Sequence, residues 1–307
     1  MSANQLPTAS APPSTAWGLP LYLSCGSVSF QGRRRALTDA VATAESFSVL
    51  SPPMCLDYFA VFDGHSSTAV AEHLKNVLHG AIDKQIQSEL HVETPRFHTT
   101  NNDDVAAWWK TTIRKAFRVV DDEMGLLEGT AGYDADVGAT ALVALVHHNY
   151  MVFANCGFSK AVLCRGCAMV LTPENENAEG YALDGEEEEE EAPESKLLRA
   201  KETALVFGSF RYKGEKQMAP PEVVAVERNL GDEFLILATD GLWETLSPRD
   251  ACFFVRQKLV NKPREQDAKG SPDKLAKELA QRAISLGSKD NVSVVIVIFR
   301  NFWKGNT

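Results

Sequence analysis

The 307-residue sequence lacks the features that mark a membrane or exported protein. It has no apolar run of the roughly 18 residues that a helix needs to cross a bilayer. Residues 1–20 lack the basic start and the apolar core of a signal peptide. We therefore expect a protein that does not enter a membrane, is not exported and works inside the cell, in the cytoplasm, the nucleus or both.

Cysteine is also scarce, with six residues in the whole chain. This number is too low, and the spacing too irregular, for a small secreted disulfide scaffold, so a reducing intracellular compartment is favoured. Cys164 and Cys167 have the CxxC form, but no second pair and no histidine pair stands at zinc-site spacing. A strand end with a tight turn is favoured there over a metal or redox role.

Basic residues are fewer than acidic ones: the chain has 31 Lys and Arg and 41 Asp and Glu, which gives a formal net charge of −10. A nucleic-acid binder needs a clustered basic face, so no nucleic-acid partner is expected. The block Glu186–Glu191 supplies six of the negative charges, within a polar and acidic segment over 173–203 that is expected to be a variable loop. The block is either a solvated loop tip or an element that competes with phosphate or attracts a basic partner.

Enough apolar residues are present for a large core, since 44% of the chain is hydrophobic. Collagen-like, coiled-coil and fully disordered chains are thereby excluded. Residues 1–20 are rich in Ala, Ser, Pro and Thr and are expected to form a flexible leader. One folded domain is expected over residues 21–304.

Hydrophobic patterning predicts hairpin-linked strands and helices that are grouped along the chain. Strands are predicted over 55–62, 138–146, 149–156, 160–165, 233–239 and 292–299, and helices over 68–83, 105–120, from Ser247-Pro248 onward and over 273–286 up to Gly287. The strands between 138 and 165 are separated by short turns, so an antiparallel meander is expected. Without strict strand–helix alternation, the pattern favours an α+β fold with antiparallel sheets.

Isolated aspartates stand at the boundaries of these strands. Asp63 and Asp240 follow apolar runs, Asp290 precedes the last run, and Asp39 lies near the start of the domain. A single such aspartate is most simply a turn former. Several of them, gathered at one end of a sheet, would repel one another unless a cation neutralised them. Oxygen ligands suit Mg²⁺ or Mn²⁺, and the absence of a Cys/His cluster argues against zinc.

Five phrases in the sequence match a known family in order and spacing: VFDGH (61–65), GATALVALV (138–146), ANCGFSKAVLCRG (154–166), FLILATDGLWE (234–244) and SKDNVSVVIV (288–297). They resemble the metal-dependent type 2C serine/threonine protein phosphatases, and their wording is closest to the plant members. The resemblance spans residues 22 to 300. It implies a four-layer αββα sandwich, in which two antiparallel sheets are flanked on each side by antiparallel helices.

The resemblance also implies a metal centre with two Mg²⁺ or Mn²⁺ ions that activate a bridging water for attack on phosphorus. Asp63 matches the carboxylate that bridges both ions, and Gly64 matches the residue whose carbonyl oxygen is a ligand. Asp240 and Asp290 match further carboxylate ligands, and Asp39 is the surviving acid of the first family motif.

Two other residues match the family positions that handle the substrate. Arg34 stands where a phosphate-binding arginine is expected, and its guanidinium suits bidentate contact with phosphate oxygens. His65 matches the proposed general acid for the leaving serine or threonine oxygen. The implied partners are phosphorylated proteins, and the chain is expected to act as a monomer.

The sequence departs from the family pattern at the metal centre. Thr38 replaces a glutamate that orients water at one ion, and Phe158 replaces an aspartate that helps hold a third, weaker metal, so that third site is doubtful. Two hypotheses follow: an active phosphatase with reduced or Mn²⁺-dependent turnover, and a pseudophosphatase that binds phosphoproteins without efficient catalysis. A two-metal hydrolase of another substrate class is a third, less favoured alternative.

Overall fold

The computed structural model describes residues 23–51, 54–92, 102–134, 136–172, 206–208, 218–260 and 272–299. The predicted leader over 1–20, the acidic segment 173–203 and its block Glu186–Glu191 lie outside the described residues. The outer limits of the predicted domain, residues 21 and 304, lie outside them as well.

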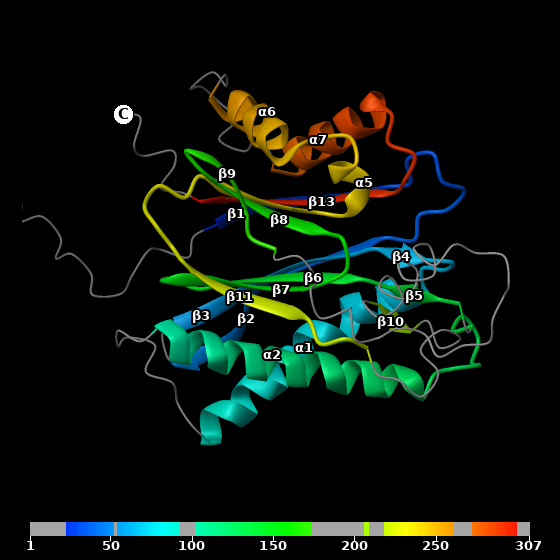
Figure 1. Cartoon of the computed structure of the whole chain (residues 1–307), viewed down its shortest axis with the longest axis vertical. Coiled ribbons are helices and arrows are strands. Elements are labelled where there is room, and N and C mark those ends of the chain that lie inside the picture. The colour runs from blue at the N-terminus through cyan, green and yellow to red at the C-terminus, as the bar shows by residue number, and fades with distance from the viewer. Residues whose placement is uncertain are drawn as a thin grey trace, which may run out of the picture.

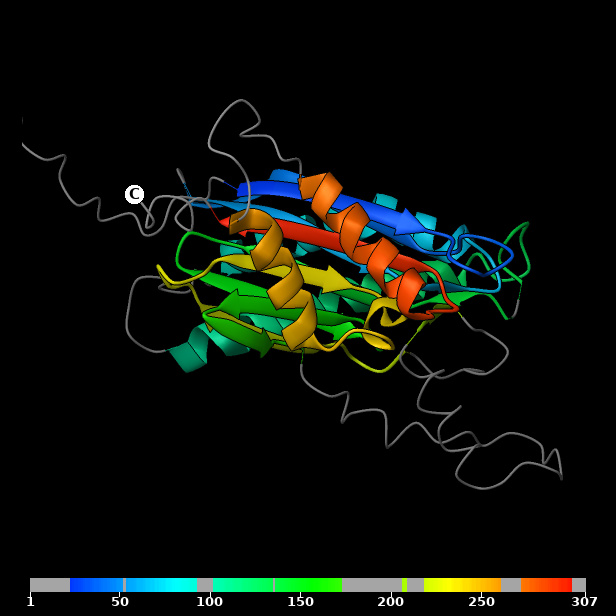
Figure 2. The same cartoon turned by 90° about the horizontal axis from the view of Figure 1, so that it is seen from above.

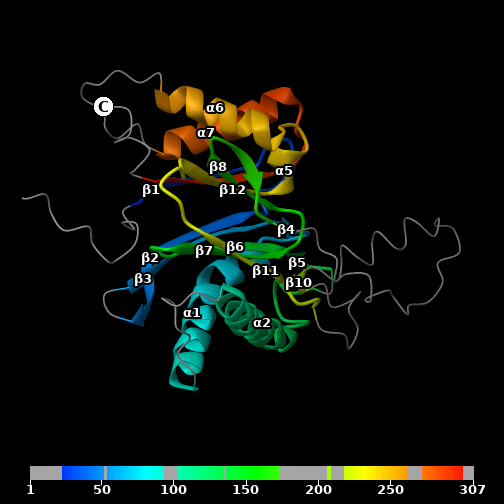
Figure 3. The same ribbon diagram turned by 60° about the vertical axis from the view of Figure 1, so that its left-hand side comes forward.

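Two five-stranded antiparallel sheets stack face to face (Figure 1). The first sheet has the order β1 (Leu23–Phe30), β13 (Val292–Phe299), β12 (Phe234–Ala238), β8 (Lys160–Arg165) and β9 (Cys167–Val170). The second has the order β11 (Glu222–Glu227), β7 (Tyr150–Cys156), β6 (Ala141–Val146), β3 (Met54–Phe62) and β2 (Ala40–Ser51). A small sheet of β10 (Phe207–Gly208), β5 (Gly138–Ala139) and β4 (Gly64–His65) lies at one end of the sandwich (Figure 3).

Helices cover the outer face of each sheet. The long helices α1 (Ala69–Val92) and α2 (Asn102–Gly125) pack on the second sheet, and α5 (Asp240–Trp243), α6 (Pro248–Val260) and α7 (Pro272–Leu286) pack on the first (Figures 1 and 2). The predicted α+β fold of four αββα layers is confirmed. Among the described helices, none combines the length and the apolar character needed to span a membrane.

The core lies in three layers, one between the sheets and one under each helical layer. The apolar stripe of α1, with Val70, Leu74, Leu78 and Ile82, is fully buried against the second sheet. Strands β6 and β7 are buried along their whole length because one face meets the helices and the other meets the first sheet. Burying each large apolar side chain contributes roughly 1.5–3 kcal/mol to stability.

The predicted meander is wrong at its last strand. β6 pairs with β7, as expected, but β8 leaves them and pairs with β12 in the first sheet. Residues 157–159 carry the chain across the gap between the two sheets. Because these strands are buried on both faces, they lack the polar alternation that would have assigned each one to a sheet. The sequence analysis also missed β1, β2, β9 and β11.

The predicted start of α6, and the predicted start and end of α7 to within one residue, agree with the structure. The Ser247 hydroxyl oxygen accepts the Asp250 N–H at 3.1 Å and its O–H donates to the Asp250 carboxylate at 2.7 Å, which caps α6. Pro248 occupies the first turn of this helix. Gly287, with φ at +113°, directly follows α7.

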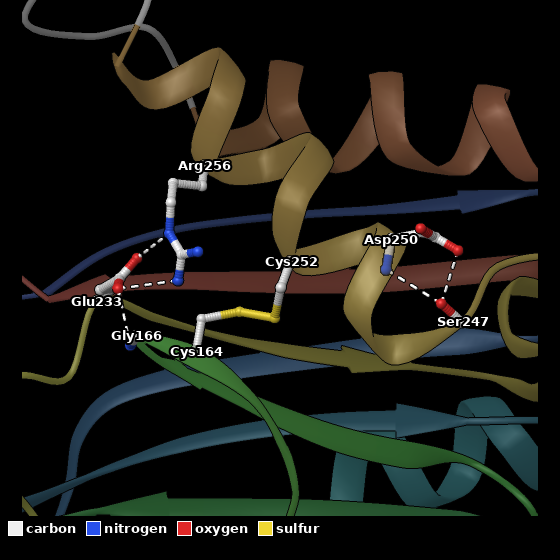
Figure 4. Close-up of a disulfide and its surroundings, with 7 residues drawn as sticks. All are labelled: Cys164, Gly166, Glu233, Ser247, Asp250, Cys252 and Arg256. Carbon is white, nitrogen blue, oxygen red and sulfur yellow. Dashed lines mark hydrogen bonds and ion pairs between the residues drawn. A yellow bond between two sulfur atoms is a disulfide. The ribbon is translucent and has the colours of Figure 1, made fainter.

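A disulfide joins Cys164 of β8 to Cys252 of α6 across 88 residues (Figure 4). Cys164 lies where β8 turns into β9, so the predicted strand end and tight turn are confirmed. The pairing itself was not predicted, because only the tertiary contact of α6 with the first sheet brings the two cysteines together. One turn further along α6, the Arg256 guanidinium donates to both Glu233 oxygens, at 2.6 and 2.9 Å. Two points of attachment therefore hold α6 on the sheet.

Removing this cross-link is expected to destabilise the domain. A bridge that closes a loop of this length stabilises a protein by about 4–5 kcal/mol in the chain-entropy model, so the Cys252→Ala variant should melt several degrees lower than the wild type. A thiol reductant should shift the wild type by a similar amount and leave the variant unchanged. Cys167→Ser is the matched control, since Cys167 is exposed and is not in the disulfide. Identical melting of oxidised and reduced wild type would contradict the prediction.

Candidate active site

The four predicted aspartates come together at one end of the sandwich. Ala40 of β2 pairs with Phe62 of β3, so Asp39 and Asp63 flank the end of that ladder. Ala238 of β12 pairs with Val294 of β13, so Asp240 and Asp290 lie beyond the corresponding end in the other sheet. Asp39 and Asp63 each interact electrostatically with both Asp240 and Asp290, so all four carboxylates lie in one region. The predicted clustering is thus observed.

Three of these carboxyls interact directly. The Asp63 carboxyl lies within hydrogen-bonding reach of both Asp39 and Asp240, and in its protonated form its single O–H can be donated to one of them at a time. Burial and then the neighbouring carboxylates, with Asp240 the largest contributor, raise the pKa of Asp63 well above its usual range. Burial also raises the pKa of Asp39 to about 7, against hydrogen bonds from Ser293 and Thr239. The pKa of Asp240 is shifted upward by burial and then by Asp290. The protein thus gathers acids whose charged forms destabilise one another.

A cation would relieve this repulsion, and the type of donor suits a hard one. The donors gathered here are carboxylate oxygens, which Mg²⁺ and Mn²⁺ prefer as ligands, and Gly64, whose carbonyl is the further ligand expected from the resemblance, directly follows Asp63. Within the described ranges, no group of three or more His, Cys, Asp or Glu side chains is already arranged around one point as metal ligands are. The residues present fit Mg²⁺ or Mn²⁺ by the chemistry and charge of their oxygen donors, and not by a ligand arrangement that is already formed.

Arg34 lies beside the acid cluster in a bidentate ion pair. Its Nε donates to Asp290 Oδ1 at 2.8 Å and its Nη2 donates to Asp290 Oδ2 at 2.6 Å. The Arg34 side chain is 60% exposed and that of Asp290 is 25% exposed, so the pair lies at the rim of the site. Arg34, which is expected to bind phosphate, therefore contacts Asp290, which is expected to bind metal.

Gly64 and His65 form the short strand β4 against β5. Gly64 is packed so closely on the segment before β2 that a Cβ atom there would stand 2.3 Å from the Thr38 carbonyl oxygen. Glycine is therefore required at this position. His65 is exposed on one side, but its partial burial lowers the pKa of the imidazole, while Asp136 acts in the opposite direction.

Comparisons with known proteins decide the family. The sequence model of protein phosphatase 2C matches residues 23–172 and 204–292. The chain belongs to the protein phosphatase 2C family. Within that family it is 33% identical to the rice protein "Probable protein phosphatase 2C 8", over 92% of this chain and 75% of the relative. It is 31% identical to the Arabidopsis "Protein phosphatase 2C 77", over 93% of this chain and 73% of the relative.

Solved structures agree with the fold. The serine-threonine phosphatase 2C from Toxoplasma gondii aligns with a TM-score of 0.67 at 16% identity, over 94% of this chain and all of that one. A C. elegans sex-determining protein aligns with a TM-score of 0.66 at 20% identity, over 92% of this chain and 67% of that one. At these identities the agreement concerns the protein phosphatase 2C fold alone.

Two departures from the protein phosphatase 2C pattern, at residues 38 and 158, lie in separate segments, one before β2 and one between β7 and β8. The Thr38 hydroxyl donates to Asn291 Oδ1 at 2.9 Å, so this side chain makes a protein contact. Phe158 lies in the crossing between β7 and β8 and is 43% exposed, which is unusual for a large aromatic ring. Neither side chain supplies a charged oxygen to the acid cluster.

The sequence analysis missed two buried residues with hydroxyl groups, Thr239 and Ser293, which both interact with Asp39. The Thr239 hydroxyl donates to Asp39 Oδ2 at 3.1 Å and accepts the Ser293 N–H at 3.0 Å. Thr239 is fully buried and joins the end of β12 to both β13 and the acid cluster. The signal in the sequence was a polar residue that ends an apolar strand directly before Asp240.

The raised pKa of Asp39 predicts a pH-dependent stability of the metal-free protein. The folded state holds a proton up to about pH 7, whereas the unfolded state loses it near pH 4. Stability should therefore fall as the pH rises through this window, by about 4 kcal/mol in all. The Asp39→Asn variant should show a smaller slope and, in chelator at pH 8, should melt above the wild type. Thermal unfolding at pH 5 and pH 8 measures both effects.

Added Mn²⁺ should stabilise the wild type at pH 8 more than Asp39→Asn. Asp232→Asn is the matched control, because Asp232 is equally buried but accepts a 2.6 Å hydrogen bond from Arg165. This control should be destabilised at both pH values, since it removes the partner of a cation. Stability of the metal-free wild type that does not change between pH 5 and pH 8 would contradict the prediction.

Proposed function

We propose that this protein phosphatase 2C member is a metal-dependent serine/threonine phosphatase, which hydrolyses phosphoserine and phosphothreonine in protein substrates. The observation that carries the proposal is the convergence of Asp39, Asp63, Asp240 and Asp290 from four separate segments, with Arg34 at the rim. Burying several carboxylates together is costly, so their convergence favours a functional over a structural explanation.

The carboxylates of these four aspartates and the Gly64 carbonyl would hold two Mg²⁺ or Mn²⁺ ions. Such ions supply a Lewis acid for phosphoryl oxygens and lower the pKa of a water molecule. Thr239 fixes the orientation of Asp39 through its 3.1 Å hydrogen bond. The short β4–β5 pairing, of Gly64 with Ala139, would hold the Gly64 carbonyl in place.

Arg34 would bind the phosphate group of the substrate. Its two donor nitrogens already engage a pair of carboxylate oxygens in the geometry that phosphate oxygens require. A phosphate bound there lies next to Asp290 and hence next to the acid cluster. His65, on the exposed strand β4, would protonate the leaving oxygen, and its lowered pKa makes the protonated ring a stronger acid.

The second candidate function is a phosphoprotein-binding module without efficient catalysis. It is favoured by Thr38 and Phe158, which provide no carboxylate where the family has glutamate and aspartate. In this function Arg34 would still bind phosphate, while turnover would be lost. The intact aspartates favour the enzyme, and monomeric state and intracellular location stay predictions for either function.

Hydrolysis of a phosphothreonine peptide distinguishes the two functions. The wild type should release phosphate in millimolar Mn²⁺ and lose this activity in chelator. Asp63→Ala should reduce kcat/KM by about 100-fold or more, because metal ligands contribute several kcal/mol to the transition state. Wild-type release that does not exceed that of Asp63→Ala would reject the enzyme, and saturable peptide binding without release would identify the binding module.

Restoring the missing carboxylate provides a second test. Phe158→Asp should raise kcat at low millimolar Mn²⁺ by about 10-fold, if a carboxylate at this position improves metal binding. Phe158→Asn is the matched control, because it has nearly the same shape as aspartate but no charge. An equal rate for both variants would show that the absence of a charge at residue 158 does not limit turnover.

A further inference from the structure

The segment 31–38, which carries Arg34, contains no helix or strand. It connects β1 to β2, and its described internal hydrogen bonds are a long one of 3.3 Å from the Arg34 N–H to the Gln31 carbonyl and one of 2.8 Å from the Gln31 side-chain amide to the Arg34 carbonyl, both between exposed residues. A side chain as long as arginine on such a connection needs another restraint if it is to present its guanidinium in one place. The contacts of Asn291 supply that restraint.

The Asn291 side chain makes four hydrogen bonds to this segment. Its Oδ1 accepts the Thr38 N–H at 2.8 Å and the Thr38 hydroxyl at 2.9 Å. Its Nδ2 donates to the Gln31 carbonyl at 2.7 Å and to the Ala36 carbonyl at 3.0 Å. Two donated and two accepted bonds satisfy a primary amide completely. One side chain thus joins both ends of the segment, with Arg34 between the points of attachment.

The backbone of Asn291 is itself fixed from two sides. The β1–β13 ladder ends at the Phe30–Val292 pair, so Asn291 stands directly beyond it and opposite Gln31. On the other side a Cβ atom on Gly241 would stand 2.0 Å from the Asn291 carbonyl oxygen, so the first turn of α5 lies against residue 291. Asn291 is only 3% exposed. Its amide therefore projects from a rigid strand end toward a segment without regular structure.

The position of Arg34 depends on this arrangement. Arg34 reaches back to Asp290, the neighbour of Asn291, with hydrogen bonds of 2.8 and 2.6 Å. The two residues directly before β13 thus hold the segment in different ways, since Asp290 pairs with the charge and Asn291 holds the backbone. Other residue types could not hold the backbone in this way, because aspartate cannot donate to Gln31 and Ala36, and serine is too short to reach both ends.

We propose that Asn291 is a positioning residue, which places the Arg34 guanidinium for phosphate binding by fixing segment 31–38. The inference rests on the phosphate-binding role of Arg34 in the proposed function. It assigns to Asn291 no contact with substrate or metal. Its effect on the phosphorylated substrate should therefore be transmitted through Arg34 and should disappear when Arg34 is absent.

A double-mutant cycle tests this dependence. Asn291→Ala should raise KM for a phosphothreonine peptide by about 10-fold, with a smaller change in kcat, because several hydrogen bonds that hold Arg34 in place are lost. In an Arg34→Gln background the same change should alter KM by less than about 3-fold. Equal factors in both backgrounds would overturn the proposal, since Asn291 would then act independently of Arg34.

Amide hydrogen exchange gives a readout that does not depend on catalysis. Asn291→Ala should speed exchange within residues 32–38 by about 10-fold or more and leave β13 protected. Asn229→Ala is the matched control, because Asn229 also holds a turn, by accepting the Gly231 N–H at 2.8 Å, at the opposite end of β12. This control should leave both KM and exchange in 32–38 unchanged. Unchanged exchange in Asn291→Ala would overturn the proposal.

Failure of the proposed phosphatase activity and failure of the positioning role of Asn291 give different results. If the wild type hydrolyses nothing, the enzyme is rejected, and calorimetric binding of the phosphothreonine peptide replaces KM in the cycle, with the same expected factors. If Asn291→Ala does not fold, Thr38→Val replaces it, because this variant removes only the hydroxyl donor from a half-buried residue. It should weaken peptide binding about 3-fold, again only when Arg34 is present. An effect of the same size without Arg34 overturns the proposal.

Discussion

The repulsion among the buried Asp39 carboxylate and its half-buried neighbours at the end of the sandwich is the constraint on which the other features of the site depend. Asp39, Asp63 and Asp240 are brought together by the registers of two different sheets, and their pKa values rise because burial and mutual repulsion disfavour the charged forms. The sheets supply the stability that this arrangement costs. Three layers of apolar core hold the strand ends in place, so the acids cannot separate to relieve their repulsion.

Two donors contact the acid cluster, a charged one at its exposed rim and a neutral one in the protein interior. Arg34 meets the cluster at its exposed rim, where it pairs with Asp290, whereas Thr239 meets it from below through a hydroxyl that orients Asp39. The neutral donor lies in the interior and the charged donor lies in contact with water. This distribution follows from solvation, because a guanidinium is far more costly to bury than a hydroxyl.

Much of this organisation could be predicted from the sequence, for reasons that are local. Asp63 and Asp240 each end an apolar run, so their place at strand ends follows from residue order alone. The partner sheet of β8 could not be predicted, because a strand buried on both faces carries no periodic signal. Neither could the Cys164–Cys252 pair or the contacts of Asn291, which join residues more than 80 and 250 positions apart. The sequence thus predicted the aspartates at the strand ends, but not the side chains that hold the segments together, such as Cys164, Cys252 and Asn291.

The pairing of β1 with β13 has a consequence for the order in which the chain folds. The first sheet has the last described strand in its interior, between β1 and β12. During synthesis β1 leaves the ribosome early, whereas its pairing partner β13 is made only after almost all of the domain. Such a contact has the longest loop to close and is therefore formed slowly. Until then β1 and β12 expose unpaired edges, so nascent chains of this protein depend on being kept apart from one another.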